Sequence, residues 1–154
     1  MEVNGYKIEP RADLRVANLQ ETKLAGTNLQ EANLQEANLA GTNLQEVNLF
    51  GANLRKADLR VANLQEANLQ EANLNFADLG VADLRGTNLA RANLIRAKLQ
   101  EANLAGANLQ RANLFEANLR KADLTGAKLT EAGSREAKWD ESTIWPEGFT
   151  PPKR

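Results

Sequence analysis

The sequence predicts an all-β solenoid, a four-sided coil in which each side is one five-residue repeat. A leucine recurs at every fifth position from Leu14 to Leu129, which gives 24 leucines without a gap. The residue two places before each leucine is always Ala, Thr or Val, and the residue one place before is Asn, Asp or Lys. One pattern of small, polar and large apolar residues therefore runs through about three quarters of the chain.

A five-residue period fits neither regular element. On an α-helix, successive leucines would be turned by roughly 140°, so no face of the helix would be apolar. On a straight strand, an odd period would send them to opposite sides. If the backbone instead turns a corner in every repeat, all leucines point to one inner axis and four repeats close a square level. Successive levels then stack at the spacing of paired strands, about 4.8 Å.

The other repeat positions agree with this geometry. The small residue fits inside the coil beside the leucine, where four sides converge and little volume remains. Asn and Asp favour turns because their side chains bond nearby backbone groups. Glycine sometimes stands two places after the leucine, where a positive φ would cost it least. These glycines are Gly26, Gly41, Gly51, Gly86, Gly106 and Gly126.

The register divides the chain into three parts. Residues 1–11 precede the repeats, and Tyr6 and Ile8 alternate there like a short strand, so we expect an N-terminal cap over the first coil. Residues 12–131 hold the repeats, in six full coils. In residues 132–154 the register decays, which predicts a partial coil and a tail.

In this last part, large residues replace leucine. Trp139, Ile144 and Phe149 continue the five-residue spacing. We expect them to point inward and to cover the end of the leucine column. Pro146, Pro151 and Pro152 remove backbone donors to which another chain could pair.

The composition excludes most reaction chemistry. The chain has no histidine and no cysteine, so the commonest general base, the commonest metal ligand and thiolate chemistry are missing. We expect no catalytic residue, no cofactor and no metal site. One carboxylate pair is notable, because coils of twenty residues place Asp58 beneath Asp78, with Lys98 above. It could bind a cation, but we favour the interpretation that both replace Asn in the corner ladder.

The charge and hydropathy bound the partners. A net charge of −1 argues against a nucleic-acid-binding surface. The N-terminus lacks the apolar run of a signal peptide, and no later segment could span a bilayer. We therefore expect a cytoplasmic monomer that binds neither nucleic acid nor membrane.

The outward positions after each leucine carry whatever identity the protein has. Most hold Gln, Glu, Arg, Ala or Gly, but one corner carries Phe76, Ile95 and Phe115 in consecutive coils. This is a candidate protein-binding patch. Two alternatives are that these side chains only stabilise their own ladder, or that the C-terminal tail covers them.

The tandem unit A-[N/D]-L-x-x, as in Ala32-Asn33-Leu34-Gln35-Glu36, resembles the pentapeptide-repeat family. The resemblance implies a right-handed quadrilateral β-helix of about six full coils with terminal caps, and it is typical of cyanobacterial members. The stretch from Trp145 to Phe149 is similar to a recurring end of those members. One inner column of the implied core contains Leu14, Leu34, Leu54, Leu74, Leu94 and Leu114.

The family shares no single activity, so function must come from the surface. We predict a non-enzymatic scaffold that binds another protein through one flat face of the β-helix. One alternative is a DNA mimic that binds DNA gyrase, as some members do. That role would need a strongly acidic surface and usually a dimer, which neither the charge nor the tail supports. The other is a purely structural or consensus-designed array without a partner.

Overall fold

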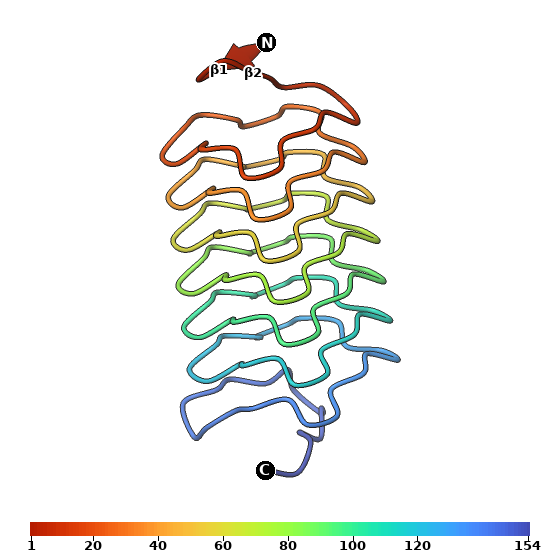
Figure 1. The fold of residues 1–154 in the computed structure, drawn as a ribbon. Helices are drawn as coiled ribbons and strands as arrows, with labels where there is room; N and C mark the ends of the chain where they lie inside the picture. The colour runs from red at the N-terminus through yellow and green to blue at the C-terminus, as the bar shows by residue number, and fades with distance from the viewer.

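The computed structural model describes residues 1–154 and is a right-handed quadrilateral β-helix, as the sequence predicted. Its coils stack in one column with the two termini at opposite ends (Figure 1). Parallel backbone bridges join each Asn or Asp position to the residue twenty places later, from Asp13 with Asn33 to Asn118 with Lys138. Four five-residue sides therefore complete each level.

Hydrogen bonds between coils hold the column together. The Leu34 N–H donates to the carbonyl oxygen of Asn53 (2.7 Å), and the Asn53 N–H donates back to that of Ala32 (2.9 Å). Within the repeat, the Ala37 N–H donates to the Leu34 carbonyl (3.0 Å) and closes the corner. The same bonds recur along the chain, so each coil is stabilised by the coils above and below it.

The corners share one backbone conformation. The second residue after each leucine has a positive φ in every coil, as the third position of a type II turn requires. The predicted glycines occupy this position with φ between 63° and 69°. Most corners, however, hold Glu, Arg, Lys, Val or Phe there, and the left-handed conformation costs such residues about 1–2 kcal/mol each. Bonding between coils must therefore outweigh local strain at most corners.

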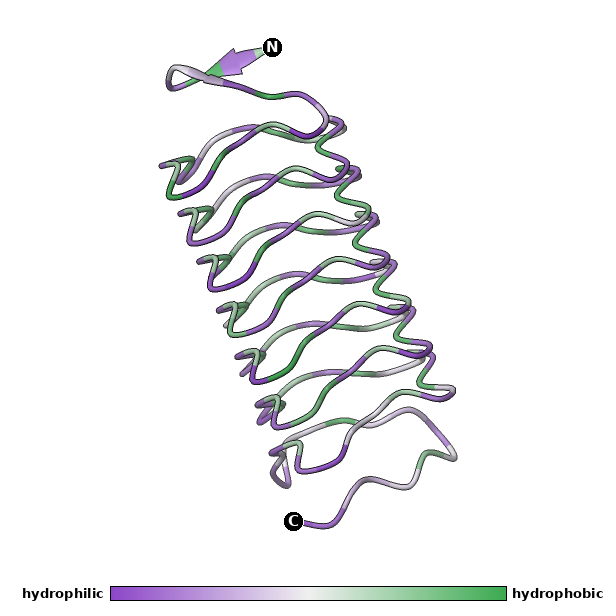
Figure 2. Cartoon of the chain, turned by 45° about the vertical axis from the view of Figure 1, so that its right-hand side comes forward, coloured by the Kyte–Doolittle hydropathy of each residue, from purple (hydrophilic) through white to green (hydrophobic).

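The leucine column forms the core. All 24 repeat leucines are buried, and the six leucines from Leu14 to Leu114 named above are at most 2% exposed. Apolar and polar segments alternate along every coil (Figure 2). Burial of one leucine contributes about 1.5–3 kcal/mol. Thr42 and Thr87 take the small inner position and are fully buried, and their hydroxyls donate to the carbonyl oxygens of Leu19 (2.7 Å) and Leu64 (2.8 Å).

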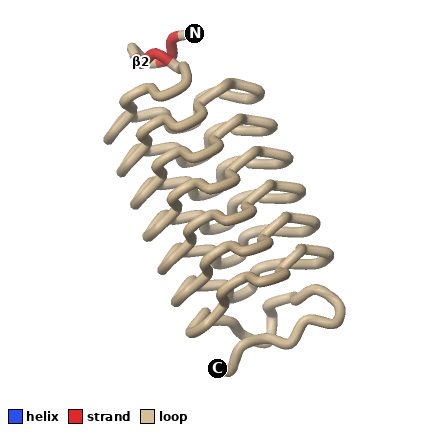
Figure 3. The backbone as a smooth tube through the Cα atoms, turned by 90° about the vertical axis from the view of Figure 1, so that its right-hand side faces the viewer, coloured by secondary structure: helices blue, strands red, loops and turns tan.

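The only two named strands precede the coils (Figure 3). Strands β1 (Glu2–Val3) and β2 (Tyr6–Lys7) pair antiparallel around an Asn-Gly turn, whose residues both have the positive φ that such a hairpin needs. Ile8 follows β2 and is 6% exposed. Val3 and Tyr6 pack against the same core, so the hairpin contributes apolar contacts at the first coil.

At the other end, the prediction for Ile144 is wrong. Ile144 pairs with Asp123, 21 places earlier rather than twenty, and its side chain is 51% exposed. One extra residue lies in the loop after Trp139, where the Asp140 carboxylate accepts the Ser142 N–H (3.0 Å). The insertion moves Ile144 to the outward ladder position and brings Trp145 to the place after it, where it packs against the core.

The cap therefore contains a residue that a constant spacing misses. Trp145 packs edge-on against Trp139 (ring centroids 5.9 Å apart) and stacks on Phe149 (5.1 Å). The Trp139 indole N–H donates to the carbonyl oxygen of Pro152 (2.9 Å), which holds the tail beneath the last coil. None of the structure's elements is a helix with the length and hydrophobicity needed to cross a membrane.

Candidate functional site

The predicted patch lies on the corner that follows Leu74, Leu94 and Leu114. Phe76 is 40% exposed and holds a left-handed conformation with φ of 61°, while Ile95 and Phe115 are half-buried. We call Phe76, Ile95 and Phe115 the corner patch. Because the turn residues cannot turn inward, these side chains line the outer edge of three consecutive coils.

Backbone hydrogen bonds fix the spacing of the corner patch. The Phe76 N–H donates to the carbonyl oxygen of Ile95 (3.0 Å), and the Arg96 N–H donates to that of Phe115 (2.9 Å). The Ile95 N–H in turn donates to the Asn75 side-chain oxygen (3.1 Å). The patch is thus a continuous ladder on a fixed backbone, at the spacing of paired strands.

Arginines flank the exposed phenylalanine. The guanidinium carbons of Arg55 and Arg96 lie 5.5 Å and 5.8 Å from the Phe76 ring centroid. Arg55 belongs to the preceding coil and Arg96 to the following one, so the ring is flanked from both sides. Arg96 is also paired with Glu116, and this ion pair lowers the pKa of the Glu116 carboxyl. Apolar and charged groups therefore alternate around Phe76.

Opposite charges also stack between coils. Arg91 and Glu71, which are twenty residues apart in the sequence, approach to 3.7 Å, whereas Glu36 and Lys56 have the same spacing but form no ion pair. These residues are exposed, so each pair contributes only a few tenths of a kcal/mol. A shallow groove of about 420 Å³ runs along this corner beside Arg91 and Arg111.

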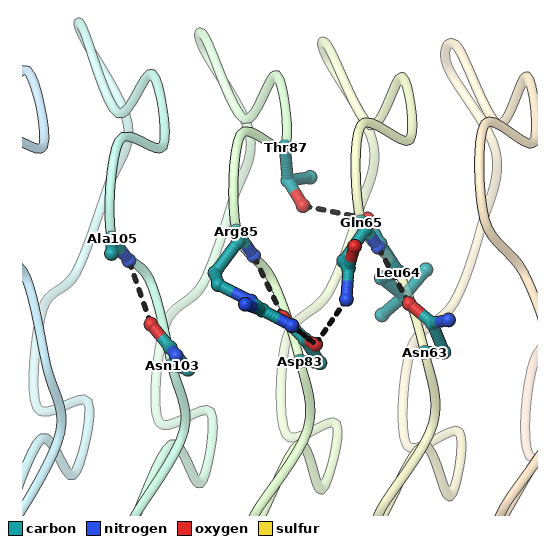
Figure 4. A network of polar contacts seen from close by, with 8 residues as sticks. All are labelled: Asn63, Leu64, Gln65, Asp83, Arg85, Thr87, Asn103 and Ala105. Atoms are coloured by element: carbon teal, nitrogen blue, oxygen red, sulfur yellow. Dashed lines mark hydrogen bonds and ion pairs between the residues drawn. The ribbon is translucent and has the colours of Figure 1, made fainter.

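A second kind of ion pair occurs within single repeats. Arg85 donates two hydrogen bonds to Asp83, from Nε to Oδ1 (2.9 Å) and from Nη2 to Oδ2 (2.6 Å) (Figure 4). We call this two-bond contact an arginine fork. Gln65, from the preceding coil, also donates to Asp83 Oδ2 (2.5 Å). The Arg85 fork is the main cause that lowers the pKa of Asp83 to about 2, against an opposing effect of burial.

The stacked carboxylates lie where the sequence placed them. Asp58 pairs with Asp78 in the ladder, and Asp78 pairs with Lys98. Arg60 forks onto Asp58 and lowers its pKa. Nowhere do three or more carboxylate, imidazole or thiolate side chains converge in a way that could hold a metal ion.

Val61 and Val81 form a further exposed pair at the next corner. They stack in consecutive coils, are 64% and 55% exposed, and both have φ of 59°. A β-branched residue is rare in this conformation. Their spacing of twenty residues is enough to place them in one stack, but it does not reveal that their backbone is left-handed.

The square coil, the inward leucine column and the type II corners define a right-handed quadrilateral β-helix of five-residue units. The model of the family "Pentapeptide repeats" matches residues 12–49, 48–86, 62–100 and 92–130. The chain therefore belongs to the pentapeptide-repeat family.

Two cyanobacterial structures are similar to it. The pentapeptide-repeat protein Rfr23 from Cyanothece is 45% identical over 60% of this chain and 63% of its own, with a TM-score of 0.60. HetL from Nostoc, a pentapeptide-repeat protein involved in heterocyst differentiation regulation, is 43% identical over 83% of this chain and 62% of its own, with a TM-score of 0.52. The chain thus spans about three fifths of the length of either protein. A comparison with curated proteins gave no match.

Proposed function

We propose that the protein is a non-enzymatic scaffold that binds another protein through the corner patch. The observation that carries this proposal is the 40% exposure of Phe76 in a left-handed turn, next to Ile95 and Phe115 in the following coils. The same outward positions elsewhere hold mostly polar or small residues. An apolar side chain at such a place stabilises the fold little and is available to a partner.

Rigidity supports binding at this surface. The backbone of the patch is bonded to the coils on both sides, so little conformational entropy remains to be lost when a partner docks. The arginines around Phe76 add polar contacts at the rim. Aromatic residues and arginine are the types that contribute most to protein–protein contacts.

The charge pattern favours a protein partner over imitation of DNA. The column of the corner patch runs Glu36, Lys56, Phe76, Arg96 and Glu116, so the sign of the charge changes along it. Several acidic side chains are neutralised by arginine forks or by ion pairs between coils. A surface that imitates a polyanion would need an uninterrupted acidic column.

The test is a double substitution, Ile95→Ser with Phe115→Ser. If the patch binds a partner, the immobilised parent captures a protein from a cell extract that the immobilised double variant does not capture. The melting temperature of the double variant should differ from that of the parent by only a few degrees. Phe50→Ser is the control, because Phe50 is a half-buried aromatic residue on another corner. A large fall in melting temperature with capture unchanged would show that the ladder is only structural.

A further inference from the structure

The aspartates of the ladder show how this fold binds an arginine side chain. We call this arrangement, a guanidinium with two parallel hydrogen bonds to one ladder aspartate, the arginine seat. Five of the repeats carry Asp instead of Asn before the leucine. In three of them the residue two places after the aspartate is arginine, and in the other two it is Gly80 and Thr125. The position of this residue, the first of the corner, decides what meets the carboxylate.

The three arginines bind in one geometry. Each donates from Nε to Oδ1 of its aspartate, over 2.8 Å for Arg15, 2.8 Å for Arg60 and 2.9 Å for Arg85. Each also donates from Nη2 to Oδ2, over 2.7, 2.6 and 2.6 Å. Because the three lie in different coils and on three different faces, the fork follows from the repeat backbone and not from a local environment.

Asp78 has the same carboxylate orientation but no arginine. Its Oδ1 accepts the Gly80 N–H (3.0 Å), as the equivalent oxygen of Asp58 accepts the Arg60 N–H (3.1 Å). Asp78 forms no ion pair, although Lys98 is its neighbour in the ladder. Asp123 is different, because the Thr125 hydroxyl donates to it (2.6 Å). Of the five ladder aspartates, only Asp78 is bonded by neither a guanidinium nor a hydroxyl. Arg60 of the preceding coil is near enough to interact with its charge but is bonded to Asp58, so the Asp78 carboxylate can still accept a guanidinium from outside.

The surroundings of Asp78 suit the rest of an arginine side chain. Val61 and Val81 lie on the corner beside Gly80 and are 64% and 55% exposed, and Phe76 begins the same side of the coil at 40% exposure. Arginine combines an apolar stem with a planar, weakly hydrated head that forks onto a carboxylate. A lysine would offer a point charge without the two parallel bonds.

We propose that a protein partner inserts an arginine side chain onto Asp78, in the fork geometry that Arg15, Arg60 and Arg85 show within the chain. Apolar residues next to that arginine would contact Val61, Val81 and Phe76. This inference rests on the proposed function, since Phe76 belongs to the corner patch, and it names the chemistry of the partner.

The substitution Gly80→Arg tests the seat from inside the molecule. The φ of Gly80 lies outside the left-handed range, so a side chain meets no backbone strain there. An added Cβ would lie 3.2 Å from Asp78 Oδ1, with its next contacts at 3.9 and 4.0 Å. Arg60 and Arg85 hold a Cβ at the equivalent position. The variant should therefore fold and should fill its own seat.

The probe is the peptide acetyl-Leu-Arg-Leu-amide, compared with the same peptide carrying citrulline, which has the shape of arginine without its charge. Backbone amide signals of Asp78 and Val81, followed by NMR, should shift saturably with the arginine peptide. We expect about tenfold weaker binding of the citrulline peptide, because charge-assisted bonds are the stronger ones. Gly80→Arg and Asp78→Asn should each abolish the shifts.

Ala105→Arg is the matched control. It adds an arginine at the same position of another corner, beside Asn103 instead of an aspartate (Figure 4), and should leave peptide binding intact. Equal shifts with both peptides, or arginine-peptide binding that survives Gly80→Arg and Asp78→Asn, would overturn the proposal.

The peptide experiment at Asp78 can fail or succeed independently of the capture experiment on the corner patch. If the peptide gives no shift while capture still depends on Ile95 and Phe115, the arginine seat is wrong and the scaffold proposal stands. If the peptide binds at Asp78 while capture survives the double substitution, the seat is supported and the corner patch is wrong.

Discussion

Leu69→Ala tests the leucine column where it is most constrained. Leu69 is 0% exposed near the middle of the column, and its N–H donates to the carbonyl oxygen of Asn88 (2.7 Å). The substitution removes three buried carbon atoms, worth about 0.8 kcal/mol each. The coils above and below are held at fixed spacing by hydrogen bonds, so they cannot collapse into the void. With the cavity term added, we expect a loss of about 3–5 kcal/mol.

The control is the same substitution at the end of the column. Leu129 is 9% exposed and borders a hollow between the last coil and the tail, so Leu129→Ala leaves a void that water enters. We expect it to cost about half as much, because part of the leucine is already solvated. Urea unfolding followed by far-ultraviolet circular dichroism measures both free energies. A loss below about 1 kcal/mol for Leu69→Ala, or equal losses for the two variants, would contradict a continuous dry column.

Two further predictions concern the surface and the cap. The Arg85 fork lowers the folded-state pKa of Asp83 from 3.8 to about 2, so its stabilisation is present above pH 4 and is lost as the pH falls towards 2. The shift corresponds to at most about 2.5 kcal/mol, and to about 1 kcal/mol after solvent screening. Asp83→Asn should thus be less stable than the parent at pH 6, and the difference should shrink to a few tenths of a kcal/mol at pH 2, where about half of the carboxylates are protonated. A difference in denaturant titrations that is as large at pH 2 as at pH 6 would refute the assignment. Trp145→Ala should cost about 3 kcal/mol because it removes the centre of the cap, whereas Ile144→Ser should cost under about 0.5 kcal/mol. If thermal melts showed that Ile144→Ser destabilises the protein more than Trp145→Ala, the five-residue spacing would continue unbroken through Ile144.

The repeat core was predictable because it depends on one repeated physical condition. Any residue that points to the inner axis must be apolar and must fit between four sides, and the sequence shows this condition 24 times. The register failed at Ile144 because the condition no longer applied after the last full coil. There the loop with the extra residue is stabilised by the Asp140 carboxylate, which accepts the Ser142 N–H, and by the Thr143 hydroxyl, which accepts the Asp140 N–H. A lone aspartate in a serine- and threonine-containing loop gives too weak a signal to locate such an insertion.

The positions of the outward residues were predictable from the sequence, but the contacts that their side chains make were not. The spacing placed Phe76 in line with Lys56 and Arg96, and it placed Asp58 beneath Asp78. It could not show that Arg55 reaches the ring, because long side chains choose among several neighbours at similar distances. The arginine forks were also missed. They depend on a residue and its second neighbour within one repeat, whereas the five-residue period identifies contacts between coils.

At the corners, the residues that determine the fold are distinct from those that the surface displays. Gly51, Glu71 and Arg91 follow one another at one corner, and Lys56 and Phe76 at the next, yet all have φ between 57° and 63°. The backbone there is set by bonds between coils, so a new corner residue changes the side chain that is displayed and little else. Inner residues have no such freedom, because each is in contact with the coils on both sides. A binding site can therefore arise at the two outward residues of each repeat without a change of the fold, and our proposal that Phe76, Ile95 and Phe115 contact a partner depends on this freedom.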